Sequence, residues 1–268
     1  MNTTIRALYI YPLKSARGVE CARVRLTATG FEWDRQWMLT APDGRFLSQR
    51  THPQLACVVP RLTDSTLVLD APGLPALELP LEPSGENVSV RVHEDRCVGL
   101  DMGEAAATWA TRVAGHPARL VRASPAPGRR VNPRFAGTVP APMAFADGFP
   151  VLVCNTASLE DLNTRLPAPI PMDRFRPNIV LGGLDAWAED HIDALAIGDV
   201  GLALVKPCTR CTIPAVDQAT GQPGTDPAPA LKAFRFDHTL RGVTFGENAV
   251  IAAGLGRELT RGAACTAS

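Results

Sequence analysis

Short β-like runs follow one another through the first hundred residues of this chain, with no helical pattern between them. Each run holds β-branched or alternating apolar residues, and turn sequences such as Pro42-Asp43-Gly44 separate several of them. A doubly wound parallel sheet would need a helix after each strand, so this order predicts a β-barrel or sandwich. The expected strands are Ile5–Tyr11, Val19–Leu26, Gln36–Thr40, Ala56–Leu62, Thr66–Leu69 and Val88–Val92.

A helix and a compositionally distinct segment end this first half. Glu104–Val113 has a helical pattern that Gly115 closes. Proline, glycine and arginine then dominate Ser124–Pro142, which fits either a linker between two domains or a basic loop folded over an anion site. The bunched arginines that favour the second interpretation are Arg129, Arg130 and Arg134.

The second half mixes strands with a helix. We therefore expect an α+β, β-rich fold, with a β-barrel-like domain over residues 1–122 and a second β-barrel domain with peripheral helices over residues 123–268. The two domains should meet around one shared pocket. The expected helix is Ser158–Leu166, and the expected strands are Val151–Val153, Asn178–Leu181, Val200–Val205, Val243–Ala252 and Glu258–Thr260.

Overall charge and apolar patterning exclude several classes of protein. Lysine plus arginine equals aspartate plus glutamate, 27 each, so no global field draws the chain to nucleic acid or an anionic membrane. Any anion site must be a local cluster of basic groups. No apolar run approaches the roughly 20 residues that span a bilayer, and Met1–Ser15 lacks a cleavage-site pattern. Seven scattered cysteines do not resemble a disulfide framework, so we expect a cytoplasmic protein.

The sharpest local feature is the sequence KPCTRC at residues 206–211. Its two cysteines fit half of a zinc site, a thioredoxin-like redox pair, or two buried cysteines with no role. A fourth interpretation is a thiolate that binds a transition metal, because the neighbouring cations Lys206 and Arg210 favour the charged form of a thiol.

Other basic residues stand beside turns or helix starts. Lys14-Ser15 follows a predicted strand, Arg35 lies in a DRQW sequence, and Arg176 precedes another strand. Residues 155–158 have the sequence of a helix amino terminus, whose free N–H groups favour phosphate. Each feature alone is more often a surface charge or a helix cap. Together with the cysteine motif they indicate an anion site.

Six sequence blocks, in order from about residue 5 to about residue 262, resemble the MOSC proteins that carry an amino-terminal MOSC β-barrel domain. This group includes the mitochondrial amidoxime-reducing component and its bacterial relatives. The blocks are LYIYPLKSAR at 8–17, DRQW at 34–37, FADGFPVLVCNTASLEDLN at 145–163, FRPNIV at 175–180, IGDVGLALVKPCTRC at 197–211 and FGEN at 245–248.

The resemblance implies a pyranopterin molybdenum cofactor held between the two domains. Its pattern assigns the metal-binding, catalytic thiolate to Cys211 and leaves Cys208 as a neighbour. Arginine suits bidentate contacts to phosphate, lysine supplies a point charge, and hydroxyl or amide groups complete such a shell. The family's phosphate- and pterin-binding positions fall on Lys14, Ser15, Arg35, Ser158, Arg176 and Asn178.

Two departures from the family pattern stand out. Relatives of the amidoxime-reducing type carry two threonines before a Val-Asp pair, where this chain has Pro214 and Ala215. Many bacterial relatives also append a ferredoxin-like domain with four cysteines for an iron–sulfur cluster. Only Cys265 follows Cys211 here, so we expect no such cluster domain in this chain.

The resemblance implies reduction of N-hydroxylated compounds such as purines, amidoximes and hydroxylamines, for detoxification. The sequence has no dinucleotide fingerprint, haem-attachment pattern or iron–sulfur motif, so the electrons should come from an external reductase or ferredoxin-like donor. Two alternatives remain open: a sulfur carrier that uses a cysteine persulfide, and a non-catalytic carrier or store of the cofactor. Trp37, Trp109 and Trp187 are either pocket aromatics or, more simply, core residues.

Overall fold

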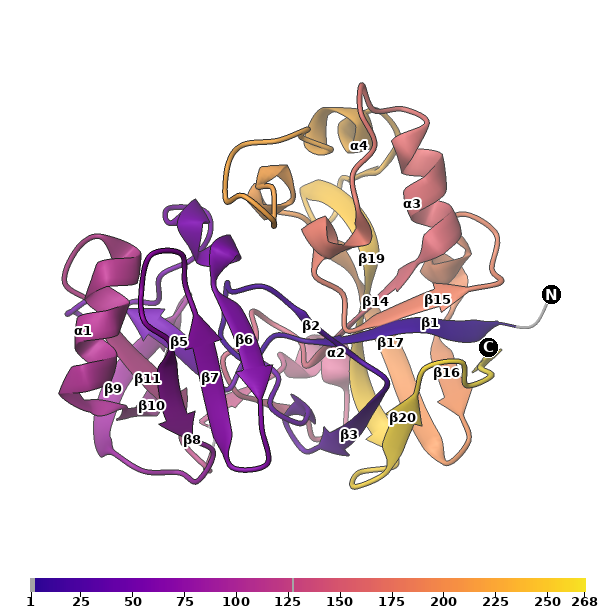
Figure 1. Ribbon diagram of the computed structural model, residues 1–268. Coiled ribbons are helices and arrows are strands. Elements are labelled where there is room, and N and C mark those ends of the chain that lie inside the picture. Colours follow the sequence, from indigo (N-terminus) through magenta and orange to yellow (C-terminus); the bar gives the residue numbers. More distant parts are fainter. Residues whose placement is uncertain (1–2, 127) are drawn as a thin grey trace.

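The computed structural model describes residues 3–126 and 128–268. It shows a β-rich molecule with helices at its periphery (Figure 1). The expected succession of strands in the first half is confirmed. That half contains β1 (Thr4–Ile10), β2 (Val19–Cys21), β3 (Arg23–Thr27), β4 (Gly30–Phe31), β5 (Trp37–Thr40), 3-10 helix η1 (Pro53–Cys57), β6 (Val59–Leu62), β7 (Thr66–Asp70), β8 (Leu77–Pro80), β9 (Glu86–Val92), β10 (Asp95–Asp101), α1 (Gly103–Ala114) and β11 (Arg119–Ala123).

The second half has the predicted mixture of strands and helices, which confirms the α+β class. It contains β12 (Arg129–Arg130), α2 (Pro133–Ala136), β13 (Pro142–Met143), β14 (Val151–Asn155), α3 (Thr156–Asn163), η2 (Met172–Phe175), β15 (Ile179–Gly182), η3 (Ala188–His191), β16 (Ala194–Ile197), β17 (Val200–Thr209), η4 (Ile213–Ala215), α4 (Ala228–Phe234), β18 (Phe236–Asp237), β19 (Gly242–Ala253), β20 (Glu258–Thr260) and β21 (Thr266–Ala267).

Several expected boundaries need correction. The single strand expected over Val19–Leu26 is two strands, β2 and β3. The start of the strand expected over Ala56–Leu62 lies in η1, because Pro53 favours the first turn of a helix. Helix α3 begins at Thr156, two residues before the expected start, because the Asn155 side chain caps it by accepting from the Ala157 N–H. Gly115, at φ 79°, closes α1 as expected.

The largest sheet joins the two ends of the chain. Its order is β2-β1-β15-β14-β19-β17-β16-β21, with β1 antiparallel to β15 and β14 parallel to β15. The expected division between residues 1–122 and 123–268 is therefore not a spatial one, because the first strands complete the sheet of the second half. A domain boundary in the sequence near residue 122 remains a prediction.

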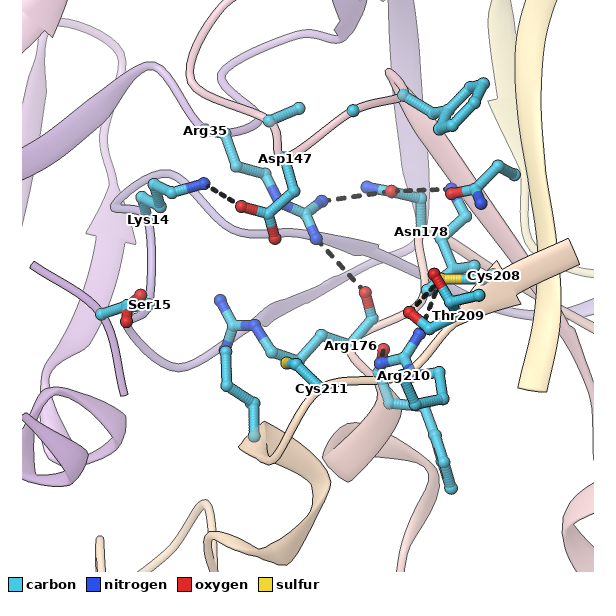
Figure 2. Close-up of a pocket in the computed structure, with 18 of the residues that line it drawn as sticks. Lys14, Ser15, Arg35, Asp147, Arg176, Asn178, Cys208, Thr209, Arg210 and Cys211 are labelled. Carbon is cyan, nitrogen blue, oxygen red and sulfur yellow. Dashed lines mark hydrogen bonds and ion pairs between the residues drawn. The ribbon is translucent and has the colours of Figure 1, made fainter. Parts of the chain in front are cut away.

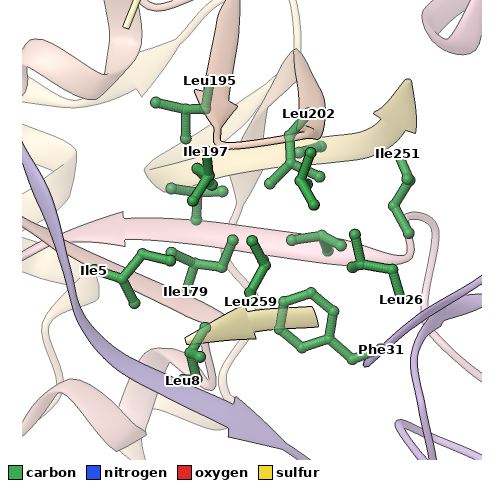
Figure 3. Close-up of a cluster of buried hydrophobic side chains, with 14 of the residues drawn as sticks. Ile5, Leu8, Leu26, Phe31, Ile179, Leu195, Ile197, Leu202, Ile251 and Leu259 are labelled. Atoms are coloured by element: carbon green, nitrogen blue, oxygen red, sulfur yellow. The ribbon is translucent and has the colours of Figure 1, made fainter. Parts of the chain in front are cut away.

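The core of this sheet explains why the amino-terminal strand lies there. Ile5 and Leu8 of β1 are buried against side chains from the far end of the chain, such as Leu195 and Leu259 (Figure 3). Burying each such side chain stabilises the fold by roughly 1.5–3 kcal/mol. The same cluster includes Leu26, Phe31, Ile179, Ile197, Leu202 and Ile251.

A separate core holds the remainder of the first half. The sheets β5-β11-β10-β9 and β6-β7-β8 flank it, and α1 packs on β11. Trp37 and Trp109 are buried in this core, and Trp187 is half-buried beside Phe245 in the other half. Trp37 and Trp109 are thus core residues, whereas Trp187 is packed against the edge of another core.

The arginine-rich segment at 124–142, apart from residue 127, which lies outside the described residues, is ordered as β12, α2 and β13. Arg129 is buried, and its Nη1 donates to the carbonyl oxygens of Ala144 (2.9 Å) and Ala146 (2.6 Å). Arg130 and Arg134 are exposed. Of the three arginines, Arg129 thus holds the backbone at 144–146 in place, and the other two extend into solvent. Every helix within the described residues is too short or too polar to cross a membrane.

Candidate functional site

One cavity lies between the two halves and is lined by both. Its volume is about 270 Å³, close to the lower end of small-molecule pockets, roughly 300 Å³. Its walls are rich in basic side chains and include both cysteines of the KPCTRC motif (Figure 2). The residues expected from the sequence that line it are Lys14, Ser15, Arg35, Arg176, Asn178 and Cys211.

Three of these residues have a backbone conformation that side chains rarely adopt. The φ angles are 70° for Ser15, 49° for Arg35 and 56° for Arg176. The described residues hold seven non-glycine positions with positive φ, and these three all line the same cavity. Such conformations cost of order 1 kcal/mol each and concentrate at functional sites. The local turns therefore support a binding role for this cavity.

Two arginines are held over one buried tyrosine. The guanidinium carbons of Arg35 and Arg176 lie 4.2 and 4.3 Å from the centre of the Tyr11 ring. Arg35 donates to Asp34 (2.6 Å) and to the Asn178 side chain (3.1 Å). Burial, with some repulsion from Arg35, lowers the pKa of Arg176 to about 10. Arg176 thus stays cationic at neutral pH, and both guanidinium groups are held in fixed positions.

Lys14 supplies a third buried cation. Its Nζ donates to Asp147 Oδ1 (2.5 Å) and to the Phe145 carbonyl oxygen (2.8 Å). Burial lowers the pKa of Lys14, and Asp147 partly offsets this effect. Partial loss of solvent around the Asp147 carboxyl raises its pKa, but Lys14 and His93 more than compensate and hold that pKa well below the usual range. The Asp147 side chain is nevertheless 67% exposed, so solvent screens this pair.

The two cysteines of the motif have different surroundings. Arg210 Nη1 donates to Cys208 Sγ (3.0 Å), and its Nη2 donates to the Phe175 carbonyl oxygen (2.8 Å). Cys211 is exposed on the cavity wall, with no hydrogen bond from its thiol among the described residues. Arg210 therefore holds the Cys208 sulfur in a hydrogen bond, whereas the Cys211 sulfur stays accessible to a ligand.

The surroundings of the motif bear on its interpretation as half of a zinc site. Within residues 3–126 and 128–268, no group of three or more histidine, cysteine, aspartate or glutamate side chains is arranged to hold a metal ion. A half-site for zinc thus finds no further ligands there. Beyond Cys211, Ile213 lines the cavity, whereas Pro214 and Ala215, the departures from the family pattern, do not.

Ser158 was expected among the cofactor contacts, but it does not line the cavity. It is buried outside the cavity lining, where its Oγ donates to Glu189 Oε2 (2.7 Å) and accepts from the Trp187 N–H (2.8 Å). Burial raises the pKa of Glu189, while the hydrogen bonds from Ser158 and Asn155 lower it. The Ser158 hydroxyl is thus committed to an internal network.

Several lining residues were not identified from the sequence. Asp147 lies within the FADGF block but carries no motif of its own, and Asn248 ends the FGEN block. Phe46, Ser48 and Arg50 come from the segment after the Pro42-Asp43-Gly44 turn, which has no sequence signal for binding. Only the folding of that segment over the cavity reveals them.

Comparisons with known proteins agree with the two-part architecture. Residues 2–117 match the family described as MOSC N-terminal beta barrel domain, and residues 140–262 match the MOSC domain. The chain is 35% identical to mitochondrial amidoxime-reducing component 1 of Mus musculus, over 87% of this chain and 71% of that protein. The human protein of the same name is 36% identical over 87% and 72%. Human molybdenum cofactor sulfurase is 30% identical over 80% of this chain and 27% of its own length.

Proposed function

Because the chain belongs to the MOSC family with an amino-terminal beta barrel domain, we propose that it is a molybdenum-cofactor-binding oxidoreductase that reduces N-hydroxylated compounds. The observation that carries this proposal is the convergence of Lys14, Arg35 and Arg176 with Cys211 on one cavity. These residues are far apart in the sequence, and a phosphate-bearing cofactor requires several donors at once.

The cavity fits an anionic cofactor in its donor set. Its inner cations are lysine and arginine, and Asp147, the one carboxylate among the described lining residues, is shared between Lys14 and His93. In our proposal Lys14, Ser15, Arg35, Arg176 and Asn178 hold the phosphate and pterin, and the Cys211 thiolate binds the metal. A soft thiolate is a suitable ligand for a transition metal.

When bound, the cofactor supplies two-electron chemistry that cleaves the N–O bond of a substrate. The overall reaction takes up two electrons and two protons, and it converts an N-hydroxyl group to N–H with release of water. The protein's residues bind and orient the reactants. Arg35 and Arg176, fixed over Tyr11, keep the anionic part of the cofactor in place, so that Cys211 meets the metal in one orientation. Candidate substrates are N-hydroxylated purines, amidoximes and hydroxylamines, and the proposed role is detoxification in the cytoplasm.

The electron source in this proposal is a separate redox protein, a reductase or ferredoxin-like donor. The test uses purified protein, with molybdenum measured by mass spectrometry and pterin by fluorescence. Reduction of benzamidoxime should occur with reduced methyl viologen and should fail with NADPH alone. Oxidation of NADPH by the pure chain would contradict the external donor.

The similarity to molybdenum cofactor sulfurase favours a second candidate, a sulfur carrier with a persulfide on Cys211. Cyanide releases the outer sulfur of a persulfide as thiocyanate. The carrier would be favoured if the wild type released stoichiometric thiocyanate and Cys211→Ser released none. The wild type would then also fail to reduce benzamidoxime. Cofactor bound without either activity would favour a storage protein.

A further inference from the structure

The cavity carries two kinds of cation. In the inner group, Lys14 and Arg176 are buried and Arg35 is half-buried, and all three are hydrogen-bonded to protein groups. The outer pair is Arg50, which is exposed, and Lys206, which is half-exposed. Within residues 3–126 and 128–268, neither outer side chain forms an ion pair or a hydrogen bond. Their charges are therefore available to a ligand.

Aromatic rings position the outer pair without neutralising it. The Arg50 guanidinium lies 5.6 Å from the centre of the Phe46 ring, and Lys14 Nζ lies 4.8 Å from the same ring. Lys206 Nζ lies 5.4 Å from the Phe135 ring and 5.8 Å from the Phe149 ring. A cation over an aromatic face is attracted by the ring quadrupole but keeps its full charge. Arg50 and Lys206 are thus ordered cations on a cavity wall.

The position of Lys206 places this charge near the reacting end of the cavity. Lys206 lies on β17, the strand that continues to Cys208 and Thr209, and Cys211 follows directly. Arg50 comes from the other half of the molecule, so the pair spans the junction of the two halves. Phe46 and Phe149 line the same cavity and offer apolar contact beside the two charges.

We propose that Arg50 and Lys206 form an anion subsite that selects N-hydroxylated substrates bearing a carboxylate or phosphate group. This inference rests on the proposed reductase function and adds the class of substrate. The inner cations hold the cofactor, and the outer pair binds the anionic substituent of the substrate. An anionic substituent in the cavity would be attracted by both charges, whereas an uncharged analogue would leave them without a counter-charge.

The kinetic test compares benzamidoxime with 4-carboxybenzamidoxime on cofactor-loaded enzyme, with reduced methyl viologen as donor. We expect wild-type kcat/KM to be higher for the carboxylate. In Arg50→Gln and in Lys206→Gln the ratio of the two kcat/KM values should fall roughly tenfold, the effect of one charge-assisted hydrogen bond. Any change in dye docking cancels in this ratio. Arg130→Gln, an exposed arginine outside the cavity, is the matched control and should leave the ratio unchanged.

A binding measurement gives a readout that needs no turnover. Calorimetry on loaded protein compares 4-amidinobenzoate with benzamidine, the two reduced products, which share the amidinium and differ in the carboxylate. Wild type should bind 4-amidinobenzoate more tightly than benzamidine, and both variants should lose this difference. That result supports the subsite even if neither substrate is reduced. In that case only the reductase function fails.

Other outcomes overturn the inference. Equal kcat/KM for the two substrates in wild type, together with equal binding of the two products, would show that the cavity does not recognise the carboxylate. An unchanged ratio in both variants, with activity lost only when a protein donor replaces the dye, would assign the two cations to donor docking instead.

Discussion

Two clusters of buried ionisable groups in this protein differ in how their charge is balanced. The cavity gathers cations, and its inner members Lys14 and Arg176 are almost fully buried. The second cluster gathers carboxylates, with Glu189 and Glu247 buried near the Asp190–Arg235 ion pair. Ser158 and Asn155 donate to Glu189 Oε2, whereas Glu189 Oε1 and Glu247 Oε1 are buried without a hydrogen-bond partner among the described residues.

The difference follows from the chemistry of the two kinds of group. A buried carboxyl can lose its charge by binding a proton. Burial, with repulsion from Asp190 and Glu189, raises the pKa of Glu247 to about 8, so this carboxyl is mostly protonated at neutral pH. Arginine does not lose its proton under such conditions. Arg176, which forms no ion pair among the described residues, therefore leaves a positive charge at the cavity for an anionic ligand, whereas a protonated Glu247 carries no charge to balance.

The largest effect we expect is at Cys211. Cys211→Ser should lower the rate of reduction of N-hydroxylated substrates by more than about 100-fold, because a hydroxyl is a harder and poorly ionised ligand. Even the loss of a residue that only hydrogen-bonds to a metal ligand lowers metal affinity or activity by about 10–100-fold. Cys208→Ser removes the sulfur that accepts from Arg210 Nη1, and it should lower the rate of reduction only several-fold. Turnover and molybdenum content measure both, with thermal melting as the control. An equal loss in the two variants would favour a redox or zinc pair.

The next effect concerns the inner cations. Arg176→Gln should weaken cofactor retention by about 10–100-fold, because a hydrogen bond to a charged group contributes roughly 1.5–3 kcal/mol. Molybdenum and pterin content after dialysis would measure it. Arg134→Gln, an exposed arginine outside the cavity, is the control. Full retention in Arg176→Gln, with a normal melting temperature, would remove the basis for calling this cluster a cofactor site.

A smaller effect is expected in the carboxylate cluster. Ser158→Ala should lower the free energy of unfolding by about 1–3 kcal/mol, because it removes one of the two side-chain hydrogen bonds to Glu189 and leaves the Trp187 N–H without its acceptor. Cofactor content should stay at the wild-type level. Denaturant titration and metal analysis measure the two quantities. If cofactor were lost while stability held, the family assignment of Ser158 would be restored and the contrast between the clusters would fail.

The smallest effect is a change in pH dependence. The pKa of Glu247 is about 8 in the folded protein against an ordinary 4.5, so the folded state binds the extra proton between these values. Its contribution to stability is complete below about pH 4.5 and is lost as the pH rises through 8. The melting temperature of wild type should therefore fall more steeply from pH 6 to pH 9 than that of Glu247→Gln. Parallel curves would show that Glu247 is ionised in the fold.

The sequence by itself determined the fold class and most of the candidate site. Spacing and turn chemistry are local properties, so the strand succession and the α1 stop at Gly115 could be predicted from neighbouring residues, and the start of α3 to within two residues. The motif blocks likewise identified Lys14, Arg35, Arg176 and Cys211, which the fold brings to one cavity.

Only the tertiary structure decided which partner each side chain meets. β1 pairs with β15, a strand about 170 residues away, because its apolar face is buried there; no local pattern encodes that register. The Ser158 hydroxyl contacts Glu189 instead of the cavity, although its helix start has the sequence expected of a phosphate site. Arg50 reaches the cavity from a segment without a motif. Contacts between residues distant in the chain depend on packing, and packing exists only once the whole fold has formed.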